Sequence, residues 1–313
     1  MPKPDIFLWA NQIEEAKDEI LLDLFVVDHD DQVYRINYET DLREQVMQQF
    51  VFNMLSEIRR GAELGLQVRE FDATDKEELI VMYLPVTDVP KSIDLLQNLT
   101  IPPDDIPLYN SNEVDFASIK TIVGRIKTPK GKESYILKTI YQSHVLKGKK
   151  SWAVEGTRFQ RFEETAALNV GSDSQVLIFE GNIMVFDTKK FERIFDYQQH
   201  KNLQAEIVLS DIEKNFKFEL PEGVKLSDLL KGRRRLITKL QKSNPSMATE
   251  ALLIETAEDF EVELEFASGS IKINNSSDLE TFVDLLNDNF IQSQMTGIKY
   301  VVASKRSIKK DTK

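Results

Sequence analysis

Hydrophobic and polar positions along the chain switch repeatedly between helical and strand spacing. Apolar residues recur every three or four positions between residues 40 and 60, which predicts a long helix. Short apolar runs predict strands, among them residues 20–27, 119–127 and 176–179. Because helices and short strands alternate in this way, the pattern predicts an α+β fold with largely antiparallel sheets in two to three segments.

A proline-rich run suggests where the segments divide. The stretch IPPDDIP at residues 101–107 has the composition of a linker. Beyond it the pattern changes to strands, including a hairpin whose strands flank the loop TPKGKE. The sequence therefore predicts an acidic α+β N-terminal domain (1–110), a β-rich core domain (111–220) and a C-terminal α+β domain (221–313).

Three elements define the predicted C-terminal domain. The run LSDLLKGRRRLITKLQK at residues 226–242 predicts one amphipathic helix, with Ser227 as its N-cap and Asn244–Pro245 as its stop. Residues 260–266 alternate between apolar and acidic side chains, which predicts a half-exposed strand. A further helix is predicted from a cap at Ser276 or Ser277 as far as Gly297.

The helix predicted over residues 226–242 separates basic from apolar side chains. At about 100° per residue its apolar face holds Leu229, Leu230, Leu236, Ile237 and Leu240. Arg233 points to that apolar side, where it must snorkel, pair with a carboxylate, or mark an apolar face that is not fully buried. The basic face is a candidate DNA contact, because cations and a hydroxyl can hold phosphate oxygens; it comprises Lys231, Arg234, Arg235, Thr238, Lys239 and Lys242. The alternative interpretation is an ordinary solvated helix face.

Charge segregation supports the DNA interpretation. The chain has a net charge of −12, and residues 1–117 alone hold 9 basic against 25 acidic side chains. Residues 118–161 instead hold 11 basic against 2 acidic side chains, and residues 231–250 hold 6 against 1. Phosphates respond to charge within a Debye length of about 8 Å, so local basic stretches can bind DNA in an acidic protein. Two loops within residues 118–161 add candidate DNA contacts: Lys130, Lys132, Lys147, Lys149 and Lys150.

Several site types are disfavoured by the residue content. The chain has no cysteine, which excludes disulfides, thiolate catalysis and cysteine-bound zinc. The aspartates at positions 28, 30 and 31 fit a turn better than a calcium loop, because the glycine and distal glutamate of an EF-hand are missing. We predict neither a metal site nor a cofactor. No leader or long apolar stretch occurs, so a soluble, cytoplasmic protein is expected.

Catalytic motifs are also missing from the sequence. No P-loop, strand-linked GxGxxG, nucleophile elbow or HExxH occurs. Carboxylates near lysines could be fitted to a metal-dependent nuclease, but such matches are expected by chance among 52 acidic and 40 basic residues. We therefore predict a protein without enzymatic activity and retain a nuclease as the less favoured alternative.

The central sequence resembles a known family. The runs VLIFEGNIMVFD and FERIFDY are similar to the family represented by KwaB, the B component of the Kiwa anti-phage defence system, and the resemblance extends from about Ser118 to Val302. These runs are hydrophobic and aromatic patterns without a catalytic signature. The resemblance implies a cytoplasmic DNA-binding effector that acts with a small membrane-spanning partner (KwaA) to restrain replication or late transcription of phage DNA. It identifies no DNA-contact residue.

Together these observations predict a sequence-nonspecific effector that binds double-stranded DNA through phosphates. The basic face has no asparagine or glutamine at its centre to read adenine. We expect a homo-oligomer, a dimer, recruited to the inner face of the membrane by its partner. In the alternative, the chain is a charged scaffold whose basic helix docks on the acidic domain of a second copy, without DNA.

Overall fold

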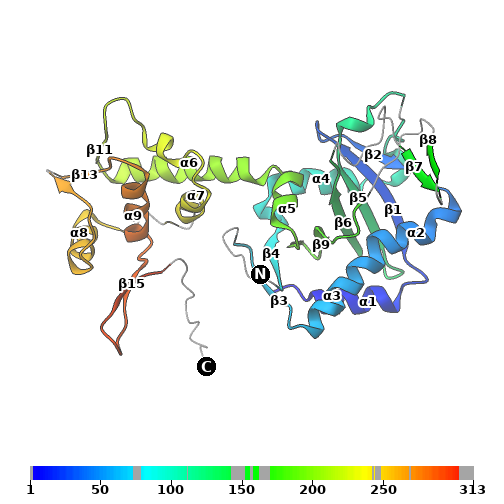
Figure 1. The fold of residues 1–313 in the computed structure, drawn as a ribbon, viewed down its shortest axis with the longest axis horizontal. Coiled ribbons are helices and arrows are strands. Elements are labelled where there is room, and N and C mark those ends of the chain that lie inside the picture. The colour runs from blue at the N-terminus through cyan, green and yellow to red at the C-terminus, as the bar shows by residue number, and fades with distance from the viewer. Residues whose placement is uncertain are drawn as a thin grey trace. The chain divides into compact units, whose positions relative to one another are not determined.

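The computed structural model describes residues 3–72, 79–110, 112–141, 152–155, 158–161, 170–241, 243, 248–267 and 269–302 (Figure 1). The chain divides into two compact units, Met1–Tyr197 and Gln198–Lys313. Helices and mostly antiparallel strands occur in both units, which confirms the predicted α+β class.

A single sheet organises the first unit. Among the described residues, eight strands follow the order β2-β1-β5-β6-β9-β10-β4-β3. Neighbouring strands are antiparallel except for the parallel pair β3 and β4. The strands are β1 (Leu21–Asp28), β2 (Val33–Ile36), β3 (Gln67–Glu70), β4 (Ile80–Pro85), β5 (Ile119–Lys127), β6 (Glu133–Thr139), β9 (Val176–Phe179) and β10 (Asn182–Val185).

Helices of the first unit follow the predicted apolar spacing. The Asp5 carboxylate caps α1 by accepting the N–H groups of Phe7 and Leu8 at 3.1 and 2.9 Å. The long helix expected from residue 40 is present, with a π-helical turn inside it. The elements are α1 (Ile6–Glu15), η1 (Thr40–Leu42), α2 (Arg43–Met47), η2 (Gln48–Phe52), α3 (Asn53–Glu63), η3 (Val86–Asp88), α4 (Pro90–Thr100), η4 (Pro103–Asp105), η5 (Phe116–Ser118) and α5 (Thr188–Ile194). A separate ribbon pairs β7 (Trp152–Glu155) with β8 (Arg158–Arg161).

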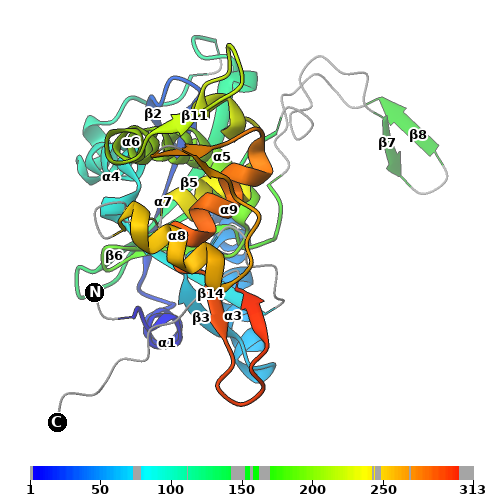
Figure 2. The same cartoon turned by 90° about the vertical axis from the view of Figure 1, so that its left-hand side faces the viewer.

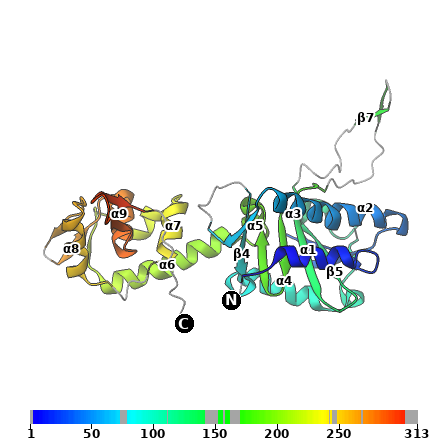
Figure 3. The same cartoon turned by 90° about the horizontal axis from the view of Figure 1, so that it is seen from below.

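Both faces of the sheet are covered by helices (Figure 3). Along β1, Leu22, Leu24 and Val26 join one apolar cluster with residues of α1 and α3. The alternating residues Phe25 and Val27 join a second cluster with residues of α4 and α5. The period of two therefore buries side chains on both sides of this strand.

Strands from both sides of the expected boundary near residue 110 belong to this one sheet. β1 pairs with β5, with Val26 opposite Ile122, and β4 pairs with β10, with Leu84 opposite Ile183. The IPPDDIP run lies against the sheet, because Ile106 is buried and the Pro107 carbonyl accepts the Arg35 N–H at 2.8 Å. Its prolines therefore shape a connection within the first unit. The predicted segments 1–110 and 111–220 do not match the two compact units, which divide after residue 197.

The second unit is built on a long helix and a small sheet. Its apolar core joins α6, α7, α8 and α9 around Phe282 and Val283. A β14–β15 hairpin extends from this core (Figure 2). The elements are α6 (Tyr197–Asn215), β11 (Phe218–Glu219), η7 (Leu226–Leu230), α7 (Arg234–Gln241), α8 (Glu250–Asp259), β12 (Phe266–Ala267), β13 (Ser270–Lys272), α9 (Ser276–Leu286), β14 (Phe290–Gln292) and β15 (Lys299–Val301).

Two predicted elements of this unit are wrong. Residues 260–266 alternate between exposed glutamates and half-buried apolar side chains, as expected, but only the last of them enters a strand. Alternation reports which way side chains face, whereas a strand also needs a hydrogen-bonded neighbour. The helix predicted as far as Gly297 ends at Leu286, because Asp288 has a φ of 53° and turns the chain into β14. Its N-cap is Asn275, one residue before the expected serines.

Candidate nucleic-acid interface

The single helix predicted over residues 226–242 is two helices in the structure. The first, η7, ends at Leu230 and the second, α7, begins at Arg234. Between them Gly232 adopts a φ of 73°, a left-handed conformation that glycine reaches without a Cβ clash. The Arg233 N–H closes the turn on the Leu230 carbonyl at 2.9 Å. The glycine therefore converts a predicted continuous helix into a turn that presents charged residues.

Apolar side chains anchor this turn in the core of the second unit. The predicted apolar face is confirmed, because Leu230, Leu236, Ile237 and Leu240 are all buried and Leu229 is half-buried. Leu226 of η7 is buried as well. Burying side chains of this size stabilises a segment by roughly 1.5–3 kcal/mol each, so the backbone of the turn is held in place.

Four cations between residues 225 and 235 are exposed: Lys225, Lys231, Arg233 and Arg235. We call residues 225–235 the basic segment. Arg233 was expected on the apolar side of a helix, but it lies in the turn and faces solvent. The Asp228 carboxylate accepts the Lys225 N–H at 3.1 Å and the Lys231 ammonium at 2.7 Å. The bond to Lys231 lowers the pKa of Asp228 and raises the pKa of Lys231, so both groups are charged at neutral pH.

Two predicted contact residues of α7 are turned inward. Thr238 and Lys239 are each only 8% exposed. The Lys239 ammonium binds Asp284 at 2.7 Å and Glu280 at 2.8 Å, both on α9. The placement of these two side chains on an exposed face was therefore wrong, because α9 packs against that side of α7. Lys242 and the side chain of Arg234 lie outside the described residues.

The second group of predicted contacts belongs to the first unit. Lys130 and Lys132 are exposed in the turn between β5 and β6, and Lys132 forms an ion pair with Glu180 at 2.9 Å. The predicted contacts Lys147, Lys149 and Lys150 lie outside the described residues.

Three other cations of the same basic stretch are buried. Lys120, Arg125 and Lys138 are 6%, 3% and 2% exposed. Lys120 pairs with Asp31, and the Arg125 guanidinium binds Asp23 at 2.7 Å. Three of the eleven basic residues in residues 118–161 are therefore accommodated inside the first unit.

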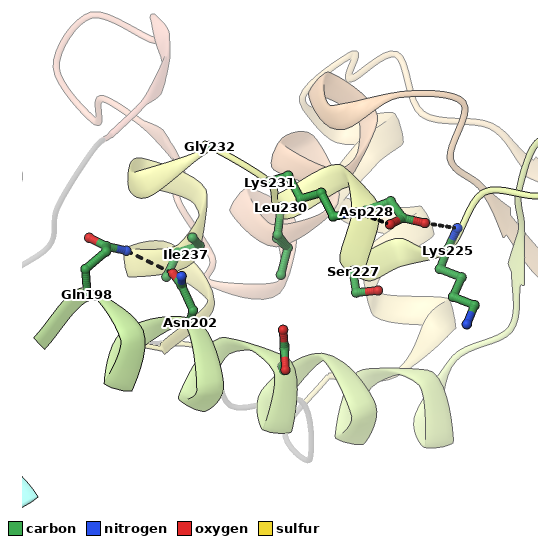
Figure 4. Close-up of a pocket in the computed structure, with 10 residues that line it drawn as sticks. Gln198, Asn202, Lys225, Ser227, Asp228, Leu230, Lys231, Gly232 and Ile237 are labelled. Carbon is green, nitrogen blue, oxygen red and sulfur yellow. Dashed lines mark hydrogen bonds and ion pairs between the residues drawn. The ribbon is translucent and has the colours of Figure 1, made fainter. Parts of the chain in front are cut away.

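The structure adds two residues that the sequence analysis missed. Gln198 and Asn202 extend from α6 toward the basic segment and line a pocket of about 490 Å³ with it (Figure 4). The Gln198 side-chain N–H donates to the Asn202 side-chain oxygen at 2.9 Å. Polar residues at positions 198, 202 and 206 have the four-residue spacing of one helix face, which was the signal available in the sequence.

The aspartates at positions 28, 30 and 31 build a turn and its ion pairs. The Asp28 carboxylate accepts the N–H groups of Asp30 and Gln32 at 2.9 and 2.8 Å. Asp31 pairs with Lys91 and Lys120, which lower the pKa of its carboxyl. Within the described residues, no group of three or more His, Asp or Glu side chains could hold a metal ion. None of the helices in this described part combines the length and the hydrophobicity that a membrane span requires.

Comparison with known proteins gives one match. The family model described as "Kiwa protein KwaB-like" matches residues 118–296. No curated protein and no solved structure matches the chain. The matched range begins immediately before β5 and includes the basic segment and its pocket. Because it covers more than half of the sequence, the chain belongs to the KwaB-like family of Kiwa proteins.

Proposed function

We propose that this KwaB-like protein serves Kiwa anti-phage defence by binding double-stranded DNA through the basic segment, without sequence preference. The observation that supports the proposal is one short segment with four exposed cations, which buried apolar side chains anchor in the core of the second unit. An anchored segment presents its charges at little additional entropic cost, since its backbone is already ordered. The proposal includes no catalytic step.

Phosphate groups are the part of DNA that suits these side chains. Lysine and arginine bind phosphate oxygens, which fixes the position of a protein on the duplex but carries no sequence information. Asp228 holds Lys231 in the free protein, and a phosphate would compete for the same ammonium. No asparagine or glutamine occurs between residues 225 and 235, so the segment itself offers no amide for reading adenine.

The test is the salt dependence of DNA binding by the full chain. If Lys225, Lys231, Arg233 and Arg235 each neutralise one phosphate, log affinity should fall with log salt at a slope of roughly −4. The double variant Lys231→Gln, Arg235→Gln should reduce that slope to roughly −2. Neutral glutamine avoids a new repulsion with Asp228. Fluorescence anisotropy with two duplexes of unrelated sequence measures both the slope and the lack of base preference.

The matched control is Lys214→Gln. Lys214 is exposed at the end of α6 and pairs with Asp211 at 2.7 Å, so the control removes one charge from the same unit outside the basic segment. It should leave the slope unchanged. Absence of duplex binding by the unmodified protein at low salt would contradict the proposal. Concentration-dependent self-association without DNA, measured by sedimentation, would then favour the charged scaffold.

The family membership also motivates a proposal about partners. We propose that the protein is cytoplasmic, forms a dimer, and is held at the inner face of the membrane by a small membrane-spanning KwaA-like component. DNA bound there would be restrained from replication or late transcription. Co-expression followed by membrane fractionation tests this: the chain should sediment with membranes only when that component is present. Sedimentation without it would contradict recruitment by a partner.

A further inference from the structure

The pocket beside the basic segment is lined by polar, charged and aliphatic residues. They include the amide residues Gln198 and Asn202, the lysines Lys225 and Lys231, the carboxylate residues Glu206 and Asp228, and the aliphatic residues Leu230 and Ile237. Its volume of about 490 Å³ lies within the ordinary range for small-molecule sites, which is roughly 300–1,000 Å³. All these residues belong to the second unit, so the pocket is complete within it.

The side of the pocket formed by the Gln198 and Asn202 amides is suited to the edge of a nucleobase. The hydrogen bond from Gln198 to Asn202 fixes the two side chains relative to each other at 2.9 Å. An amide pair of this kind offers a carbonyl oxygen as acceptor and an NH₂ group as donor, the combination that matches adenine. The Glu206 carboxylate also lines the pocket and is an acceptor for an exocyclic amino group.

The opposite side of the pocket is suited to a phosphate. Lys225 and Lys231 supply positive charge, and the Ser227 hydroxyl is a donor. A phosphate there would compete with the Asp228 carboxylate, which also lines the pocket, for the Lys231 ammonium. Figure 4 shows Ser227 and Lys225 on the segment that faces α6. Leu230 and Ile237 provide apolar surface for the flat face of a base.

We propose that this pocket binds one unpaired nucleotide, with its base against Gln198 and Asn202 and its phosphate at Lys225 and Lys231. The inference rests on the proposed function, because the same lysines would hold the duplex. A paired base is stacked inside the helix and cannot enter a pocket of this kind. The ligand is therefore either a free nucleoside monophosphate or a nucleotide of a single-stranded region. Glu206 favours bases that carry an amino group, so adenine and cytosine should bind better than thymine.

Binding of four probes to the full-length protein tests the inference: dAMP, dTMP, a 12-nucleotide single strand and a duplex of the same length. Calorimetry serves for the mononucleotides and anisotropy for the oligonucleotides. The double variant Gln198→Ala, Asn202→Ala should weaken single-strand binding about tenfold, the size expected for loss of a bidentate base contact. Its affinity for the duplex should be unchanged. The matched control is Gln199→Ala, an exposed glutamine of α6 that does not line the pocket, and it should change neither affinity.

The probes also separate the two sources of the ligand. Binding of dAMP, weakened by the double variant, identifies the free nucleotide as a ligand, whereas binding of the single strand alone assigns the pocket to unpaired DNA. Either result supports the inference. It is overturned if neither probe binds, or if the double variant binds both as the unmodified protein does. A third result is that the unmodified protein binds the nucleotide, the double variant does not, and no form of the protein binds the duplex. This result would contradict the proposed function but would still support the pocket assignment.

Discussion

Two stretches of this chain are basic in the sequence, but the structure places their cations differently. In residues 118–161, Lys120, Arg125 and Lys138 are buried in the first unit. In the basic segment, Lys225, Lys231, Arg233 and Arg235 are exposed. A count of charges therefore does not give the surface field, because the element that carries each residue decides whether its charge reaches solvent.

The strand β5 shows why Lys120 and Arg125 are internal. Both faces of the sheet are covered, so the side chains of a central strand meet helices or neighbouring strands along most of its length. Arg125 is accommodated because its guanidinium binds Asp23 at 2.7 Å and the Leu99 carbonyl at 2.7 Å and lies 5.2 Å from the Phe25 ring. A buried cation needs such partners to offset its desolvation. The basic segment contains the turn between η7 and α7, and Lys225, Lys231, Arg233 and Arg235 remain in contact with water.

The largest effect is expected at Lys239, a buried cation of α7 that follows the exposed basic segment in the sequence. The change Lys239→Ala should lower the free energy of unfolding by about 3–5 kcal/mol, because it leaves the buried Asp284 carboxylate without its cation. Urea denaturation measures the change. Arg235→Ala, an exposed position one turn earlier, is the control and should change stability by less than about 0.5 kcal/mol.

A second variant separates a structural role of Lys239 from a DNA contact. Replacing the pair together, as Lys239→Met with Asp284→Leu, removes both buried charges and should recover much of the lost stability. Salt-dependent DNA binding should be unchanged in that double variant. A stable Lys239→Ala protein with weakened DNA binding would show instead that Lys239 reaches the phosphates.

An intermediate effect on stability is expected from a change of pH, through Lys138, one of the buried cations of residues 118–161. Burial lowers the pKa of Lys138 to about 8, although its ammonium donates to the carbonyls of Gly171 and Asp173 at 2.9 Å each. Between pH 8 and 10 the unfolded chain keeps this proton and the folded chain releases it. The free energy of unfolding should therefore rise with pH across this window, by roughly 2 kcal/mol.

The variant Lys138→Met identifies the source of that rise. Urea denaturation at a series of pH values should give a flatter profile between pH 8 and 10 for the variant than for the unmodified protein. Above pH 10 the trend should reverse, because burial raises the pKa of Tyr197 to about 12 and the unfolded chain then loses a proton that the folded chain retains. Identical profiles below pH 10 would contradict the assignment to Lys138.

Local pattern predicted most of the fold. Strands such as β5 and β9 were found at their observed positions, because runs of apolar residues bounded by turns leave few alternatives. The pairing of β1 with β5, across about 90 residues, was not found, since periodicity indicates how a strand is buried and not which strand lies beside it. The linker composition of residues 101–107 was also misleading, because composition does not show that this run packs against the sheet.

The candidate site was predictable only in part. The apolar face of α7 was correctly identified from spacing along a helix. The inward position of Lys239 depends on carboxylates of α9, about 40 residues away in sequence, which no local pattern reports. Gln198 and Asn202 were missed for the same reason, because they meet the basic segment only through the packing of α6.

The smallest effect on stability is expected in the β5–β6 turn, where cations of residues 118–161 are exposed to solvent. Lys132 pairs with Glu180 at 2.9 Å, but its side chain is 55% exposed, so Lys132→Ala should change the free energy of unfolding by less than about 0.5 kcal/mol. DNA binding is the more informative measurement for this turn. If Lys130 and Lys132 each hold a phosphate, the change of both to alanine should reduce the salt slope by about 2. An unchanged slope would exclude Lys130 and Lys132 from the DNA contact.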